Sequence, residues 1–153
     1  MAIRNIVIQG EPVLHRRATE VAPDFLRTPE FQRLISDMIE TMYAAKGVGI
    51  AAPQIGVGQR LFIAESPDGP MALVNPVFTS KSRQRYQDEE GCLSVPGEFL
   101  PIYRHRSVEV EALTVDGKPV AFKASGFFAR VLQHEMDHLD GILIVDRSRE
   151  AKK

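Results

Sequence analysis

The stretch Gln133-His134-Glu135-Met136-Asp137-His138-Leu139 contains the pattern His-Glu-x-x-His. Residues four positions apart lie one above the other on one face of an α-helix, so His134 and His138 can bind the same metal ion. Glu135 projects beside them, where a carboxylate can serve as general base toward a metal-bound water. Imidazole suits both zinc and ferrous iron. The stretch therefore predicts a helical metal centre; the alternative is a chance match whose histidines are ordinary core or surface residues.

The residues around this stretch predict where its helix begins and ends. Ser125 can cap the first turn, and Gly141 is a typical residue to end the last one. The β-branched and apolar run at 142–145 predicts a final strand-like segment. The polar tail at 146–153 is expected to be frayed.

A single cysteine, Cys92, lies in Glu90-Gly91-Cys92-Leu93-Ser94, so no intrachain disulfide can form. The thiol is then either a small buried hydrophobe or a metal ligand. Gly91 permits an unusual backbone turn beside it. One thiolate, two imidazoles and a water complete a tetrahedral site with one exchangeable position, which is the pattern of catalytic centres, whereas structural sites use four protein ligands.

Small residues crowd the segment 47–56, Gly-Val-Gly-Ile-Ala-Ala-Pro-Gln-Ile-Gly. It is no phosphate loop, because the Gly-Lys-Ser/Thr ending is missing. One interpretation is a tight connection packed against the core. The other is a strand-like edge that offers backbone hydrogen bonds to a peptide, with Gln54 donating from its side-chain amide to a developing oxyanion.

The rest of the chain supplies the scaffold. Thr28 and Pro29 predict the start of an amphipathic helix whose apolar residues recur to Met42, and Gly47 predicts its end. Residues 18–26 show no clear period and are expected to form a loop. Strands are predicted at 60–64, at 71–74 with Asn75-Pro76 ending it, at 107–115 and at 120–122.

Length and composition predict one globular domain over residues 1–153. The chain is 44% hydrophobic and 25% charged, with a net charge of −1. This charge balance argues against nucleic-acid or membrane binding, and the short basic run at 81–85 is expected to be solvated. No apolar run approaches the roughly 18 residues of a membrane-spanning helix, so a cytoplasmic location is the default expectation.

The segments 47–54, 90–94 and 133–139 occur in the order and spacing of the peptide deformylase signature, and the chain resembles that family along its whole length. The resemblance implies an α+β fold, with antiparallel sheets around a central His-Glu-x-x-His helix and a second long helix nearer the N-terminus. It also implies removal of the N-formyl group from the initiator methionine of new polypeptides, with release of formate.

The resemblance also implies roles for individual residues. Cys92, His134 and His138 would ligate one divalent metal, which is ferrous iron in the cell and can be zinc, nickel or cobalt in purified protein. Glu135 would be the general base and then the acid. The formyl oxygen and the substrate backbone would be bound by Gln54, the backbone N–H of Leu93, Gly49, Val48 and Gly91. The expected partners are nascent formyl-methionyl chains, which the protein would encounter near the ribosomal exit tunnel. The expected oligomeric state is a monomer.

Recognition of methionine requires an apolar pocket beside the metal. Val131 and Phe127 lie one and two helical turns before His134, on the same side, and we predict that they line this pocket with Val48 opposite. The alternative is that they are plain core residues.

One departure concerns arginine. Many family members carry an arginine soon after the cysteine motif, but the first one here is Arg104. We expect Arg104 to pair with Glu90 or Asp137 and support the metal ligands from behind.

The His-Glu-x-x-His pattern also occurs in proteins of two other functional classes. A zinc peptidase of the metzincin type needs a third histidine where Ile144 stands, and a later acidic ligand is left only Glu150. A non-enzymatic module with a structural metal needs a fourth protein ligand, and there is no second cysteine.

Overall fold

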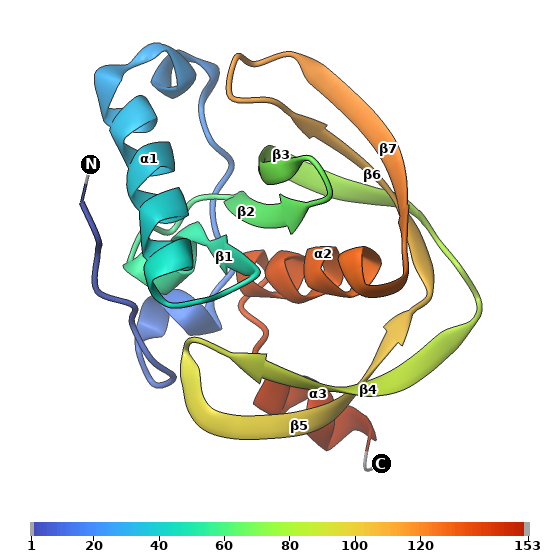
Figure 1. The fold of residues 1–153 in the computed structure, drawn as a ribbon. Helices are drawn as coiled ribbons and strands as arrows, with labels where there is room; N and C mark the ends of the chain where they lie inside the picture. Colours follow the sequence, from blue (N-terminus) through green and yellow to red (C-terminus); the bar gives the residue numbers. More distant parts are fainter. Residues whose placement is uncertain (1, 152–153) are drawn as a thin grey trace.

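Helix α2 (Gly126–Leu139), which carries the His-Glu-x-x-His pattern, lies between two antiparallel sheets in the computed structural model (Figure 1). The structure describes residues 2–151, with side chains as far as Ser148. The larger sheet has the strand order β1-β2-β3-β6-β7, and the smaller one pairs β4 with β5. This arrangement confirms the predicted α+β fold with a central motif helix.

The predicted strands are present. Those expected at 60–64, 71–74 and 120–122 are longer than predicted, and the one expected at 107–115 ends two residues earlier. The larger sheet consists of β1 (Gly49–Ala51), β2 (Leu61–Ser66), β3 (Gly69–Lys81), β6 (Ser107–Leu113) and β7 (Pro119–Ser125). In β6 the side chains of Val108, Val110 and Ala112 are buried and the two glutamates between them are exposed, as alternation predicts. β1 forms one edge of this sheet and pairs only with β2 among the strands of the sheet order.

The predicted amphipathic helix is α1 (Pro29–Ala44). Its first turn is capped as expected, because the Thr28 hydroxyl accepts a hydrogen bond of 3.2 Å from the Phe31 amide. The predicted stop at Gly47 is displaced by one residue. Lys46 itself takes the left-handed conformation, with φ of 58°, and the Gly47 amide donates to the Met42 carbonyl.

Two segments differ from their sequence-based predictions because polar side chains satisfy the backbone there. β3 does not end at Asn75-Pro76 but continues through a bulge, in which Asn75 has a positive φ and exchanges two hydrogen bonds with the backbone of Val21. The predicted loop at 18–26 contains a bridge from Thr19 to Gln59 and the start of a 3-10 helix, η2 (Pro23–Arg27). Two further 3-10 helices are η1 (Pro12–His15) and η3 (Ala52–Ile55).

The smaller sheet was not predicted as a pair of strands. β4 (Arg85–Cys92) and β5 (Val95–His105) form a long hairpin whose tight turn contains Leu93 and Ser94. Both strands are rich in charged residues and proline, which weaken the sequence signal for a strand. The basic run at 81–85 leads into this hairpin and is largely exposed, as predicted.

The C-terminal segment is a helix, which corrects two predictions. The strand-like run at 142–145 instead leads into helix α3 (Ile144–Ala151), and the tail from 146 is helical as far as it is described. Asp146 accepts a 2.9 Å hydrogen bond from the Leu143 amide, which fixes the first turn. Leu143 and Ile144 are buried with Val95 and Ile102 of β5, so their apolar character serves packing rather than strand pairing. Residues 152–153 and the Glu150 side chain lie outside the described part.

The core has three apolar clusters, one on each side of the large sheet and a third between β5, η1 and α3.

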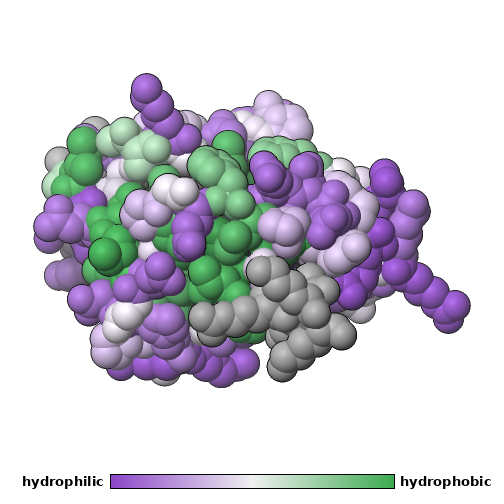
Figure 2. Space-filling view, turned by 90° about the horizontal axis from the view of Figure 1, so that it is seen from below, coloured by the Kyte–Doolittle hydropathy of each residue, from purple (hydrophilic) through white to green (hydrophobic). Residues whose placement is uncertain are grey.

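Seen from the side on which Figure 1 draws β5 and α3, apolar side chains gather on one part of the surface, with polar ones on both sides (Figure 2). Within residues 2–151, no helix is both long and apolar enough to cross a membrane.

The end of α2 is fixed by backbone contacts to the N-terminal segment. The Leu139 carbonyl accepts from the Ala18 amide at 2.8 Å and from the buried Arg60 guanidinium at 2.8 Å. Gly141 follows with φ of +76°, and a Cβ on it would stand 2.7 Å from the Arg16 backbone nitrogen. The turn after α2 therefore requires glycine at this position.

We expect Gly141→Ala to lower the free energy of unfolding by about 2 kcal/mol or more, because the left-handed conformation is strained and backbone must move. Denaturant unfolding measures this loss. Gly58→Ala is the control, since its Cβ would meet only side-chain atoms at 3.7 Å or beyond. An unchanged stability of Gly141→Ala would contradict this description of the turn.

Candidate metal centre and active site

Three predicted ligands come together from two elements. Cys92 ends β4, and His134 and His138 lie one turn apart on α2. One donor atom from each lies within 4.8 Å of the other two, and the Cys92 sulfur is 3.3 Å from Nε2 of His138. One sulfur and two imidazole nitrogens at this spacing fit a tetrahedral transition metal with one further position for solvent.

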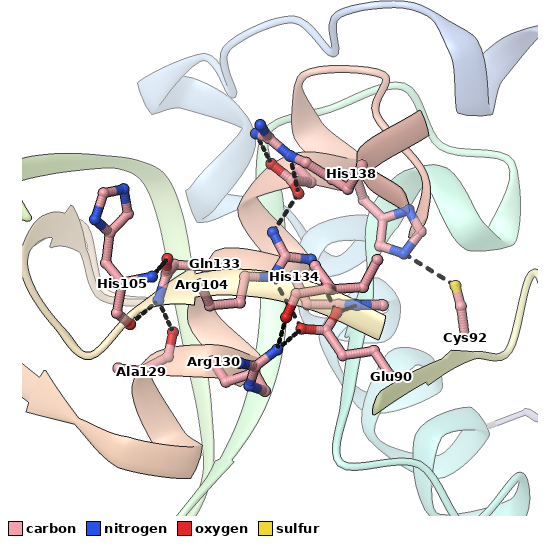
Figure 3. A network of polar contacts seen from close by, with 12 residues as sticks. Glu90, Cys92, Arg104, His105, Ala129, Arg130, Gln133, His134 and His138 are labelled. Atoms are coloured by element: carbon pink, nitrogen blue, oxygen red, sulfur yellow. Dashed lines mark hydrogen bonds and ion pairs between the residues drawn. The ribbon is translucent and has the colours of Figure 1, made fainter. Parts of the chain in front are cut away.

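A buried carboxylate orients one of these ligands from behind. Nδ1 of His134 is 2.9 Å from Oε1 of Glu90, which leaves Nε2 to face the other two donors. The Arg104 guanidinium donates to both oxygens of Glu90 at 2.9 Å, and Arg130 donates to Oε2 at 2.6 Å (Figure 3). Arg104 also pairs with Asp137, so it contacts both of the carboxylates named as alternatives from the sequence.

Burial and neighbouring charges shift the pKa values of Glu90, His134 and His138 in different directions. Burial alone would raise the pKa of Glu90, but hydrogen bonds from Arg104 and His134 hold that pKa well below its usual range. Burial and the charge of His134 lower the pKa of His138, which favours the neutral imidazole that metals bind. Burial opposes a charge on His134, yet contacts with Cys92 and Glu90 raise its pKa.

Glu135 lies next to the ligands and is buried. Its side chain is 3% exposed, and Oε1 has no hydrogen-bond partner among the described residues. Burial raises the pKa of Glu135 to about 7. A Cβ on Gly49 of strand β1 would overlap the Glu135 carboxylate, so the glycine is what allows the sheet edge to approach this side chain.

Gln54 is held with its amide nitrogen toward the cysteine. Its Oε1 accepts from the Ala51 amide at 2.9 Å, and Nε2 donates to Ser94 Oγ at 3.2 Å and lies 3.9 Å from the Cys92 sulfur. Because the oxygen is fixed by the backbone, the donor side of the amide faces the metal centre. Ser94, which is fully buried, was not singled out from the sequence for this contact.

A cleft of about 490 Å³ opens above these groups. Apart from His138, which is buried behind the cleft, all predicted site residues line it: Val48, Gly49, Gln54, Gly91, Cys92, Leu93, Phe127, Val131, His134 and Glu135. Phe127 is 64% exposed and stands at the mouth, so it is not a core residue, whereas Val131 is 5% exposed. Phe99 also lines the cleft and covers Gly91, where a Cβ would meet its ring at 2.8 Å.

Several supporting residues were missed by sequence reasoning. Arg130 is 3% exposed and contacts Glu90, and Gln133 joins α2 to β5 through hydrogen bonds to both backbone groups of His105 (Figure 3). Both fall on the helix face next to the histidines, and the partners named here, His105 and Glu90, lie 28 and 40 positions away in sequence. Polar side chains on a buried helix face need hydrogen-bond partners, so Arg130 and Gln133 were the sequence signal for such contacts.

Comparison with known proteins agrees with this site. The family model described as polypeptide deformylase matches residues 3–153. The chain belongs to the polypeptide deformylase family. It is 44% identical to the peptide deformylase of Pelotomaculum thermopropionicum over 153 residues, which cover 100% of this chain and 96% of that one.

Solved deformylase structures share the fold. The crystal structure of peptide deformylase from Thermotoga maritima has a TM-score of 0.90 at 41% identity, covering 95% of this chain and 97% of that one. A Met-Ala-Ser-bound class I type b peptide deformylase from Acinetobacter baumannii has a TM-score of 0.90 at 37% identity, covering 95% and 98%. The chain is thus a hydrolase with peptide deformylase function and a Cys-His-His metal site. Membership of this family favours deformylase function over the peptidase and structural-metal alternatives.

We expect Gly49→Ala to reduce deformylase turnover by about 10²-fold, because its Cβ displaces the confined Glu135 carboxylate, and displacements near 1 Å are costly in an active site. Steady-state kinetics on a formylated peptide measure the loss, and circular dichroism checks the fold. Gly58→Ala serves as the matched control away from the cleft. Full turnover in Gly49→Ala would contradict the close approach of β1 to Glu135.

Proposed function

We propose that this chain removes the formyl group from the N-terminal formyl-methionine of newly made polypeptides and releases formate. The observation that carries the proposal is the buried Glu135 carboxylate, with one unpartnered oxygen, beside the converging donors of Cys92, His134 and His138. A general base beside a three-ligand metal centre suits hydrolysis of a small amide.

The chain's own residues carry the proton and the charge. When bound, a divalent metal supplies a water of lowered pKa and polarises the formyl carbonyl. Glu135 accepts the proton as the water oxygen attacks the formyl carbon, and later returns a proton to the leaving amine. Negative charge on the formyl oxygen is met by the Gln54 amide and the Leu93 backbone N–H.

The cleft supports binding of an extended peptide along the edge strand β1. β1 is an edge strand, so Val48 and Gly49 can align an extended substrate by backbone hydrogen bonds, with Gly91 on the facing hairpin. Val131 and Phe127, with Val48 opposite, form the apolar surface for the methionine side chain. A structural relative from Acinetobacter baumannii is described as Met-Ala-Ser bound, which supports a peptide as the kind of ligand proposed here.

The native metal and the setting are part of the same proposal. The donor set accepts ferrous iron, zinc, nickel or cobalt, and we propose ferrous iron in the cell. Comparing activity after anaerobic purification with each metal tests this, and full oxygen resistance of the native enzyme would argue against iron. We further propose action in the cytoplasm on chains leaving the ribosome, as a monomer, which cell fractionation, ribosome sedimentation and light scattering test.

A paired assay tests the reaction itself. One peptide carries formyl-methionine at its N-terminus, and the second has the same sequence with a free N-terminus. We expect formate release from the first and no backbone cleavage of either. Cleavage of the unmodified peptide alone would sink the proposal in favour of a peptidase.

We expect Glu135→Gln to lower turnover by at least about 10²-fold, and by more than loss of one oxyanion donor, while the protein keeps its metal. Turnover and metal content are measured on the same sample. Glu40→Gln is the matched control, because Glu40 also has a buried, unpartnered carboxylate oxygen but lies outside the cleft. A Glu135→Gln variant with normal turnover would refute the base role.

A further inference from the structure

Helix α3 contacts the motif helix through one arginine. Arg147 donates from Nε to Oδ2 of Asp137 at 3.0 Å and from Nη2 to Oδ1 at 2.7 Å. This is a two-bond pairing of a planar guanidinium with a carboxylate. Asp137 is 6% exposed and lies on α2 between the two histidines of the motif.

Asp137 is in turn connected to a metal ligand. Its Oδ2 also contacts Nη1 of Arg104, and the same guanidinium donates to both oxygens of Glu90. Glu90 then contacts Nδ1 of His134 at 2.9 Å. A continuous run of charged contacts therefore joins α3 to the imidazole that faces the metal centre, and Figure 3 shows its Arg104–Glu90–His134 part.

We propose that Arg147 is a positioning residue for the metal centre, acting on His134 through Asp137, Arg104 and Glu90. The proposal rests on the ligand assignment made above. Oδ1 of Asp137 receives its described hydrogen bond from Arg147, so losing that guanidinium leaves a buried carboxylate oxygen unpaired. Arg104 is shared between both carboxylates, and its turning toward Asp137 would withdraw donors from Glu90.

This role is separate from merely holding the helix. Leu143 and Ile144 are almost fully buried against β5, and Asp146 fixes the first turn of α3, so the helix has its own packing. Arg147 also lies outside the set of residues that line the cleft. Its loss should therefore change the metal centre without changing contacts to the peptide.

The test uses the full chain with Arg147→Gln. Zinc affinity of the metal-free protein is measured by competition with a coloured chelator, and cobalt-loaded protein is examined by visible absorption, which reports ligand geometry. We expect about tenfold weaker zinc binding and a changed cobalt spectrum, as for loss of groups that orient metal ligands. The KM for a formyl-methionyl peptide should stay unchanged.

Arg17→Gln is the matched control. Arg17 also pairs with an aspartate at the end of α2, Asp140 at 3.9 Å, but it is 69% exposed and has no described link to Asp137. This control should keep the affinity and the spectrum of the original protein. If Arg147→Gln fails to fold, Arg147→Lys carries the comparison, with a loss of about threefold because one ammonium cannot satisfy both oxygens.

Wild-type zinc affinity and an unaltered cobalt spectrum in a folded Arg147 variant would overturn the positioning role. Cys92→Ser separates this from a failure of the proposed function. If Cys92→Ser loses zinc and Arg147→Gln does not, only the positioning role fails. If Cys92→Ser binds zinc as before, the ligand assignment fails and the positioning role with it.

Discussion

The structure depends on the buried carboxylate of Glu90. It receives hydrogen bonds from Arg104, from Arg130 and from the ring of His134, and so joins the β4–β5 hairpin to helix α2. Cys92 lies on the same strand as Glu90, so fixing Glu90 against the helix also places the thiol beside the two imidazoles. Burying such charges is costly, and the cost is offset only when each partner is present with good geometry.

The parts that would perform the chemistry are supplied by regular elements rather than by mobile loops. In the proposed reaction, helix α2 would provide two ligands and the base, the hairpin the thiol and the oxyanion donor at Leu93, and the edge of the large sheet Gly49. Gln54 follows that edge strand and is oriented by the Ala51 backbone. Groups held by packed elements keep their geometry without rearrangement, which favours both metal binding and stabilisation of charge during the reaction.

The sequence was sufficient where spacing alone decides geometry. His134 and His138 share a face because of the helical repeat, and the alternation of Val108, Val110 and Ala112 predicted a half-buried strand. The sequence was insufficient where the position of a side chain depends on partners that are far away in the chain. Nothing local to Arg130 indicates that Glu90, forty positions away, awaits it. Charged residues concealed the β4–β5 hairpin, and the apolar run at 142–145 resembled a strand although it packs one face of a short helix.

X-ray absorption at the metal edge of zinc-loaded protein tests the central claim most directly, because it counts ligands by element. The account predicts one sulfur at about 2.3 Å and two imidazole nitrogens at about 2.0–2.1 Å, with a light atom in the remaining position. A zinc shell without sulfur, or with a single imidazole, would contradict the convergence of Cys92, His134 and His138 on one ion.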